Sequence, residues 1–556
     1  VLAKEVLPKV LKPARYLGNE LNSVHKNWEK TKIKIALAYP DLYEIGMSNL
    51  GLQILYHIIN QQDDALAERV FAPWVDMEQQ LSASNIPLFS LESLRPLKDF
   101  DLIGFSLGHE LTYTNLITIL KLGGIPIQSL DRKENDPLVM AGGPCVFNPE
   151  PIKDFFDFFV IGEAEEAILE IIEVLRDKNL KTKSQKLEKL AKISGIYVPS
   201  LQNQVKKRFV KDLNAVPYPT KPIIPFVEAV HDRAVLEIMR GCKWACKFCQ
   251  AGWTYLPVRE RKPEMLYQLA EELVKHTGYE ELSLVSLSSS DYSKIEEVAK
   301  NLATKYESQK INISLPSMRT NTFTVKLAKE ISRVRCCSIT LAPEAGTQRL
   351  RNLIGKNMSE EHILEGVKAA FSEGIESVKL YFMIGLPSER EEDLLGICNL
   401  AQKILEIGKT HCPRARVTVN LATFIPKPHT PLQWEEQISI EETIARQKFI
   451  KKNLKVKNIE VRWHQAEASF LEGVFARGDQ KLSKVIEEAW ELGARFDAWS
   501  ESFKFDLWQR AFAKCGIDPK EYLRARKFDE PLPWDYIDPG VSKEALLAAL
   551  KPNVQS

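Results

Sequence analysis

The chain has 556 residues, of which 44% are hydrophobic and 27% charged. This composition is ordinary for globular protein, and the length suffices for about two to four domains. The net charge of +1, from 75 basic and 74 acidic residues, gives no electrostatic argument for nucleic acid or an acidic membrane as a partner, although a local basic groove would not show in this total.

The sequence also bears on the cellular compartment. It contains no run of about 18 apolar residues, so it predicts no membrane-spanning helix and no membrane partner. Its N-terminal residues are interrupted by prolines and charges and do not read as a secretory signal. We therefore expect a cytoplasmic protein. Because cysteines stay reduced in that compartment, the nine cysteines are not expected to form a disulfide framework.

Strands alternate with helices in the first part of the chain. A strand-like run begins at residue 33, after an N-terminal arm at 1–32 that has little periodicity. Further helical and strand patterns follow at 49–61, 99–107, 114–124, 136–144 and 157–175. This alternation predicts an α/β domain over 33–178, with a doubly wound, Rossmann-like parallel sheet whose loops open at one edge.

A second α/β region follows a linker at 179–227, which is rich first in lysine and then in proline. Within 228–435, strand patterns recur between amphipathic helices at 234–240, 281–287, 311–317, 337–343, 377–384 and 417–423. They predict an open, partial (β/α)6 barrel, with catalytic groups at the carboxyl ends of its strands. Residues 436–556 are predicted to be a mainly helical C-terminal region.

Three cysteines follow the first strand of this barrel in the segment MRGCKWACKFCQAGW. Cys242, Cys246 and Cys249 have the spacing C-x3-C-x2-C. Three thiolates on a [4Fe–4S] cubane leave one iron open for another ligand. A zinc site is the alternative, with a fourth ligand such as His231, but no paired C-x2-C or H-x3-H follows.

At this loop the sequence resembles the radical SAM superfamily, whose members cleave S-adenosylmethionine (SAM) reductively at such a cluster. The resemblance implies several SAM-binding roles. Phe248, just before the last cysteine, would contact the adenine. At later strand ends, the serines of SLSSSDY would bind the amino group, Arg319 the carboxylate and Glu344 the ribose; those serines are Ser288, Ser289 and Ser290. Gly385 and Pro387 of the G-L-P element would shape the backbone of the adenine pocket.

Each of these roles has a simpler alternative. Phe248 could be ordinary packing, the serine run an ordinary turn, and Arg319 a residue of the barrel rim. Glu344 could pair with Lys379 instead of binding ribose. The segment FIPKPHTPLQW is similar to the barrel end of methylthiotransferase-like members, where His429 is either a substrate-facing acid or base or a packed loop residue.

The segments GGPCVFNPEP and VIGEAEE resemble a cobalamin-binding domain placed before the barrel. Such domains carry D-x-H-x-x-G after the first strand, and this chain has DLYEIG there. A phenol is a far poorer cobalt ligand than imidazole, so cobalamin would be bound without a histidine lower ligand, unless His109 substitutes. The implied cobalamin residues are Asp41, Tyr43, Gly46, Gly142, Gly143, Gly162 and Glu163. The alternative is a relict domain that binds substrate or a partner.

Over nearly its whole length the chain is similar to a radical SAM family with an N-terminal cobalamin-binding-like domain. The resemblance implies an enzyme that forms a 5′-deoxyadenosyl radical and acts as a cobalamin-dependent methyltransferase, with an external electron donor such as flavodoxin or ferredoxin. The alternatives are a cobalamin-independent radical SAM enzyme, methylthiotransferase-like or catalysing a rearrangement, and a non-catalytic Fe–S redox sensor. RNA, peptide and small molecule all remain open as substrates.

Overall fold

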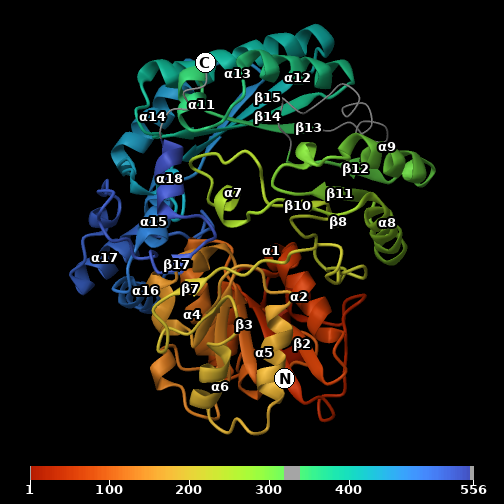
Figure 1. Cartoon of the computed structure of the whole chain (residues 1–556), viewed down its shortest axis with the longest axis vertical. Helices are drawn as coiled ribbons and strands as arrows, with labels where there is room; N and C mark the ends of the chain where they lie inside the picture. The colour runs from red at the N-terminus through yellow and green to blue at the C-terminus, as the bar shows by residue number, and fades with distance from the viewer. Residues whose placement is uncertain (1, 318–337, 551–556) are drawn as a thin grey trace. The chain divides into compact units, whose positions relative to one another are not determined.

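A computed structural model describes residues 2–317 and 338–550 of the chain (Figure 1). The fold divides into two compact units. The first unit contains Val1–Asp232, Val474–Tyr522 and Pro531–Gly540, and the second contains Arg233–Gly473, Leu523–Glu530 and Val541–Ser556. Among the helices described, none has the length and apolar character needed to cross a bilayer.

The first unit is built on a six-stranded sheet in the order β2-β1-β3-β4-β5-β6. The strands are β1 (Ile33–Tyr39), β2 (Ala65–Phe71), β3 (Leu102–Ser106), β4 (Leu138–Gly142), β5 (Phe158–Val160) and β6 (Ile196–Tyr197). All neighbours are parallel except β5 and β6. The chain leaves β1 for β2 on one side and returns to β3 on the other, so the predicted doubly wound fold is confirmed.

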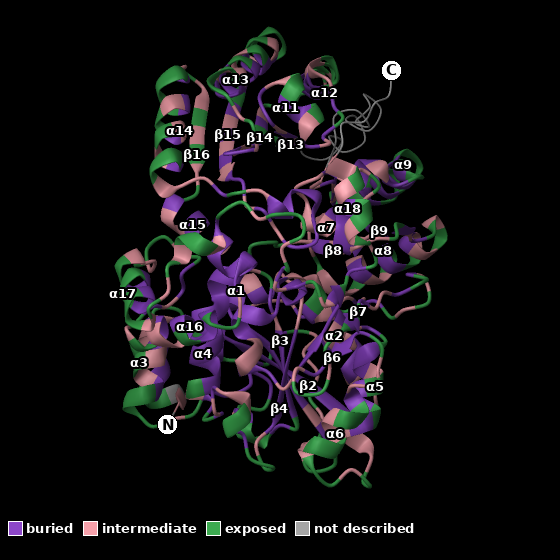
Figure 2. Ribbon diagram, turned by 60° about the vertical axis from the view of Figure 1, so that its left-hand side comes forward, coloured by how far each residue is buried: buried purple, intermediate pink, exposed green. Residues whose placement is uncertain are grey.

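Helices cover this sheet. They include α1 (Tyr43–Gly46), α2 (Leu50–Asn60), α3 (Val75–Ala83), α4 (Tyr113–Leu122), α5 (Ala167–Arg176) and α6 (Lys183–Leu190). Asn49 caps α2, because its side chain accepts a hydrogen bond from Leu52 N at 2.8 Å. The central strands are buried over nearly their whole length, which makes the sheet the core of the unit (Figure 2).

Strand β2 was not among the predicted strands. Its sequence, ALAERVF, places Glu68 and Arg69 in the middle of a fully buried run. Two adjacent charges break the apolar pattern by which a buried strand is identified. The fold accommodates Arg69 by pairing it with Glu20 and Glu92 at 2.7 and 2.6 Å.

C-terminal segments complete the first unit. Helix α16 (Leu482–Glu491) packs against α4, where Trp490 Nε1 donates to Thr118 Oγ1 at 2.8 Å. Helix α17 (Phe505–Cys515) packs on α16, and β17 (Ile537–Asp538) pairs with β7 (Val205–Lys206).

The second unit contains two parallel sheets, in the orders β12-β11-β8 and β13-β14-β15-β16. Their strands are β8 (Ala234–Glu237), β11 (Glu281–Val285), β12 (Asn312–Ser314), β13 (Ser338–Glu344), β14 (Ser377–Ile384), β15 (Arg416–Thr423) and β16 (Ile459–Trp463). A strand lies at each predicted position, and β16 is additional. The predicted α/β class is confirmed.

The second unit also has a short antiparallel pair, β9 (Met239–Arg240) with β10 (Arg259–Glu260). Its helices are α7 (Gln250–Thr254), α8 (Pro263–Thr277), α9 (Ile295–Tyr306), α11 (Gln348–Leu353), α12 (Glu360–Ser372), α13 (Glu391–His411), α14 (Ile440–Asn453) and α18 (Lys543–Leu550), with α15 (Ala466–Arg477) running across the boundary between the units. On β14 the residues alternate: Val378, Leu380, Phe382 and Ile384 are buried.

Candidate functional site

The cysteine loop connects β9 to α7. Gly241 opens it with φ +88°, and a Cβ there would lie 2.9 Å from the carbonyl oxygens of Tyr255 and Pro257, so only glycine fits. Cys249 ends the loop as the N-cap of α7, where its sulfur accepts a hydrogen bond from Gly252 N at 3.4 Å. The local backbone therefore fixes both ends of the segment that holds the three thiols.

Distant segments of the same unit anchor this loop. Lys247 N donates to Ile354 O at 2.9 Å, and Leu432 N donates to Lys247 O at 3.2 Å. Trp253 Nε1 donates to Cys246 O at 3.0 Å. Hydrogen bonds therefore connect the loop to α7, to the end of α11 and to the segment after β15.

The thiols lie close enough to influence one another. Burial raises the pKa of Cys249 to about 11, and the negative charges of Cys246, Cys242 and Glu344 add to that effect, while the hydrogen bond from Gly252 opposes it. Three thiolates in one loop require a cationic group to balance their charge, and binding of iron would displace the thiol protons. The donor set therefore fits a cluster.

His231, the suggested fourth zinc ligand, belongs to the first unit, where its backbone N donates to Ser48 Oγ at 3.1 Å.

The serine turn after β11 packs under the cysteine loop through a carboxylate that the sequence analysis missed. Asp291 accepts hydrogen bonds from Trp244 Nε1 and Ser288 Oγ, and it lies 3.3 Å from the ammonium of Lys243. The signal was present in the sequence, since the acid directly follows the serine run. Asp291 joins the turn to the loop that carries the cysteines.

The three predicted serines are all buried. Ser289 has an internal role, because its hydroxyl donates to Leu284 O at 2.9 Å and its backbone N donates to Ser317 O at 2.7 Å. Ser288 bonds to Asp291. These contacts hold the turn in shape, and the SAM-binding role of Ser288, Ser289 and Ser290 stays a prediction. Arg319 lies outside the described residues.

Of two further predicted residues, Phe248 lies within the cysteine loop and Glu344 lies near it. Phe248 packs against an apolar cluster that contains Leu386 of the G-L-P turn and Phe424. Glu344 has φ +68° and pairs with Lys356 at 3.4 Å. Lys379, the ion partner suggested from the sequence, lies on β14 and is exposed, and the ribose-binding role of Glu344 stays a prediction.

His429 and the G-L-P turn lie on the two segments that follow β15 and β14. His429 is buried with φ +58°, and its backbone N donates to Gln433 Oε1 at 2.9 Å. Gly385 has φ +83°, and a Cβ there would lie 2.7 Å from the Ile438 side chain. Pro387 follows in the same turn. Gly385 therefore shapes the backbone of this turn, and the role of Pro387 stays a prediction.

In the first unit, the hydroxyl of Tyr43 is used in internal hydrogen bonds. The side chain of Tyr43 is buried, its hydroxyl donates to Glu20 Oε1 at 2.8 Å, and that hydroxyl accepts from Phe226 N at 3.1 Å. Burial raises its pKa well above the ordinary value, and the charge of Glu20 raises it further. The phenol is therefore a structural group and is unsuited to bind cobalt.

The other residues of the DLYEIG frame are also used internally. Asp41 accepts hydrogen bonds from Trp499 Nε1 at 2.8 Å and from Leu42 N at 2.7 Å, and burial raises its pKa. Gly46 packs beneath Phe71, whose ring lies 2.1 Å from where a Cβ would be. The loop after β1 is thus part of the core and does not fit a corrin.

The turns after β4 and β5 differ from one another. A Cβ on Gly143 would lie 2.6 Å from Leu107 O, and one on Gly162 would lie 2.0 Å from Arg208 O. Glu163 accepts from Val210 N at 2.7 Å. Gly142 is different, since a Cβ there meets no atom closer than 3.8 Å. Of the predicted glycines, Gly142 is the one that leaves room for close approach of a flat ligand.

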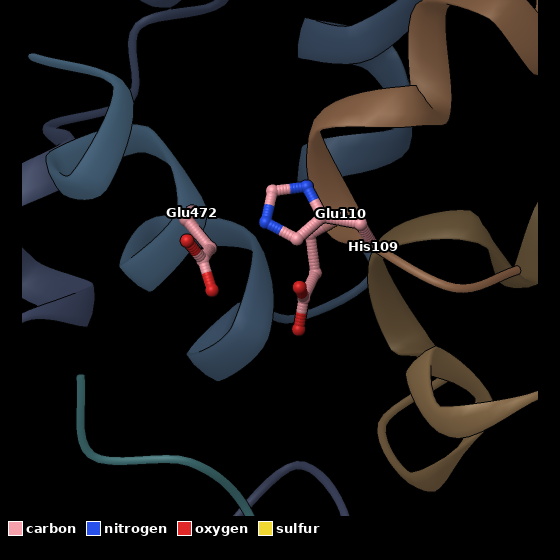
Figure 3. Close-up of side chains that lie close together, drawn as sticks. All are labelled: His109, Glu110 and Glu472. Carbon is pink, nitrogen blue, oxygen red and sulfur yellow. The ribbon is translucent and has the colours of Figure 1, made fainter. Parts of the chain in front are cut away.

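His109 follows β3 at the same edge of the sheet. Figure 3 shows it beside Glu110 at the start of η5 (Glu110–Thr112), and also draws Glu472, which in the second unit pairs with Lys427 at 2.8 Å. The Nδ1 atom of His109 accepts a hydrogen bond from Leu111 N at 3.3 Å. In a neutral ring this places the proton on Nε2, which disfavours His109 as a cobalt ligand.

Comparison with protein families gives two matches. A model described as the N-terminal region of radical SAM proteins matches residues 51–199, and the radical SAM superfamily model matches residues 236–401. The protein MJ0966 of Methanocaldococcus jannaschii, whose name calls it uncharacterized, is 32% identical over 458 residues, which cover 82% of this chain and 90% of that protein.

More distant similarities involve enzymes with named reactions. A tRNA-2-methylthio-N(6)-dimethylallyladenosine synthase of Syntrophomonas wolfei is 26% identical over 31% of this chain and 40% of that protein. Among solved structures, the radical SAM methyltransferase TsrM of Kitasatospora setae, with tryptophan and a SAM analogue bound, matches with a TM-score of 0.50 at 14% identity, over 74% of this chain and 76% of that chain. A second TsrM structure, with cobalamin and a [4Fe–4S] cluster bound, matches with a TM-score of 0.47 at 12% identity, over 70% of this chain and 75% of that one.

Proposed function

The chain belongs to the radical SAM superfamily, and we propose that it is a methyltransferase that uses SAM, a [4Fe–4S] cluster and cobalamin. The observation that carries the radical SAM part is the cysteine loop. It holds three thiols, of which Cys246 is buried, on a backbone fixed from both ends. When bound there, the cluster and SAM supply a 5′-deoxyadenosyl radical after one-electron reduction.

We assign the protein's own residues to three roles around this loop. Phe248 and the G-L-P turn would bind the adenine, since both contact one apolar cluster. Glu344 would orient the ribose of SAM, and Lys356 would hold the Glu344 carboxylate in place through their ion pair. Asp291 would hold the cysteine loop against the serine turn. These residues bind and orient, and they exclude water from the reacting atoms.

Cobalamin would supply a carrier for the methyl group. The proposal for it rests on the doubly wound sheet and on the fold similarity to TsrM. Gly142 offers backbone at the carboxyl edge of the sheet, where such folds bind ligands. The loop after β1 provides no cobalt ligand, so we assign cobalamin to this edge without a lower ligand from Tyr43.

The electron donor would be an external flavodoxin or ferredoxin. Iron-binding thiols must stay reduced, which supports a cytoplasmic location. In this proposal the methyl acceptor is a carbon or phosphorus atom of an RNA, a peptide or a small molecule.

Anaerobic reconstitution tests the proposal in two steps. The protein with iron and sulfide should form 5′-deoxyadenosine from SAM under reducing conditions, and the triple variant Cys242→Ala, Cys246→Ala, Cys249→Ala should not. If the triple variant formed it equally well, the assignment of the cluster would be wrong. Added cobalamin should co-purify with corrin absorbance. Turnover of SAM with no corrin affinity would instead indicate a cobalamin-independent enzyme.

A further inference from the structure

The turn after β14 closes around the side chain of Glu389. Glu389 accepts a hydrogen bond from Gly385 N at 2.8 Å, and its own backbone N donates to Leu386 O at 3.0 Å. Its side chain is only 2% exposed. The four residues before Glu389 therefore close a loop over its side chain, and these residues include the G-L-P element.

A cation from a different helix completes the arrangement. Arg446 of α14 donates through Nη1 to the same oxygen of Glu389 at 2.8 Å. Ile438, just before α14, lies against Gly385 so closely that no side chain fits there. The segment around α14 thus holds the turn by one apolar contact and one ion pair.

The neighbouring acid Asp393 ties the turn to the preceding strand. It accepts hydrogen bonds from Thr347 Oγ1 and Arg349, and Arg349 also donates to Ser388 O at 3.0 Å. The turns after β13 and β14 are therefore joined into one frame. Within it, Glu389 is the buried carboxylate that faces the backbone of the G-L-P turn.

We propose that Glu389 and Arg446 are a positioning pair for SAM: their ion pair fixes the Gly385–Ser388 turn and thereby sets how tightly the enzyme binds the nucleoside half of SAM. This inference rests on the proposed function, which places that turn beside SAM. Neither residue is required to touch the reacting atoms. Their effect is to pre-organise the turn, which lowers the cost of binding.

The arrangement predicts a pH dependence of binding. Burial raises the pKa of Glu389 to about 7, the charge of Asp393 adds to this, and Gly385 N and Arg446 oppose it. The other acid near Arg446 is Glu442, whose pKa is lowered by its hydrogen bonds with Ser439 and by Arg446. Above pH 7 the pair is ionic, and below pH 7 Glu389 becomes neutral and the charge pair is lost.

The Kd for SAM, measured by anaerobic equilibrium dialysis of the cluster-loaded full chain between pH 6 and 8, tests this. We expect binding about tenfold weaker at pH 6 than at pH 8, since a charge-assisted hydrogen bond contributes about 1.5 kcal/mol. Glu389→Gln imitates the neutral acid. It should bind SAM at pH 8 about as weakly as the wild type does at pH 6, and any slope that remains in it reports the amino group of SAM.

Glu392→Gln is the matched control, because Glu392 is an exposed acid on the first turn of α13 and should leave the profile unchanged. Arg446→Gln should move the midpoint of the wild-type profile above pH 7, since the cation that favours ionised Glu389 is gone. Cluster absorbance and thermal unfolding show whether each variant is folded.

The outcomes separate the positioning role from the proposed function. If both Gln variants lowered the melting temperature but kept the wild-type Kd profile, the pair would be structural only and the inference would be overturned. If the cluster-loaded wild type bound no SAM at any pH, the proposed function itself would fail. A shifted midpoint in Arg446→Gln, together with a flat profile in Glu389→Gln, supports the positioning role.

Discussion

Replacing Arg69 with methionine should destabilise the first unit severely. The guanidinium donates to Glu20 at 2.7 and 3.0 Å and to Glu92 at 2.6 Å, and all three side chains are at most 2% exposed. The Met side chain fills most of the space but leaves two buried carboxylates without their cation. Breaking a buried ion pair in this way costs about 3–5 kcal/mol, which corresponds to a fall of roughly 10 °C in melting temperature.

The same substitution should reverse the pH dependence of stability. Burial by itself raises the pKa of Glu20, but the charge and hydrogen bonds of Arg69 bring it below the ordinary value. In the wild type Glu20 therefore contributes stability above pH 4.5, which is lost as the pH falls through the lowered pKa. Without Arg69, burial dominates and the pKa becomes raised. The variant should then gain stability as the pH falls from about 8 toward 5.

Calorimetric unfolding of the full chain at pH 5, 6.5 and 8 measures both effects. Lys32→Met is the control, because Lys32 is 69% exposed and lies 3.9 Å from Asp64, and a surface pair of this kind contributes about 0–1 kcal/mol. Adding Glu20→Gln to Arg69→Met should recover part of the loss. A melting temperature for Arg69→Met equal to that of the control, or one that falls with decreasing pH, would refute the reasoning.

Three further substitutions test other parts of the structure. Tyr43→Phe should lower the free energy of unfolding by about 1–2 kcal/mol, because it removes the hydrogen bond to Glu20. It should leave corrin affinity unchanged. Loss of corrin absorbance at an unchanged melting temperature would contradict this. Asp291→Asn weakens the contact with Lys243, and a partly exposed pair of this kind contributes about 0.5–1 kcal/mol. A chelator should therefore bleach the cluster about two- to fivefold faster in this variant. An unchanged bleaching rate would argue against the role of Asp291 in holding the cysteine loop. Gly143→Ala, at φ +100°, should cost about 1–3 kcal/mol in thermal unfolding, and clearly more than Gly142→Ala; equal losses would contradict the assigned strain.

The parts of the fold that follow from local pattern were predictable. Strands such as β1 and β14 show as apolar runs because burial on a sheet selects for them, and the spacing of the three cysteines is local chemistry within one loop. Strand β2 was not predictable in this way, because Arg69 is neutralised by residues 49 and 23 positions away. From sequence alone, a charged residue is predicted to be exposed unless its ion-pair partners are known.

The same limit applied to the C-terminal segments. Their sequence is helical and rich in tryptophan, but nothing local indicates that Trp490 donates a hydrogen bond to Thr118. Nor does it indicate that Asp497 accepts hydrogen bonds from both Trp508 and Thr114. The bonds to Thr118 and Thr114 bring together residues more than 350 positions apart along the chain. Asp291 directly follows the serine run, but its role was missed because its partners Trp244 and Lys243 follow a different strand.

The DLYEIG frame shows why a motif has to be tested by its contacts. Asp41, Tyr43 and Gly46 keep the spacing of a cobalamin loop, yet each has a structural role. Asp41 accepts a hydrogen bond from Trp499, and Tyr43 donates one to Glu20. Gly46 packs beneath Phe71. Their spacing alone is therefore no argument for or against cobalamin. The question moves to the backbone at Gly142, where a side chain would meet no close neighbour. If corrin binds this unit, Gly142→Ala should weaken it while Tyr43→Phe does not, and the reverse result would return the site to the loop after β1.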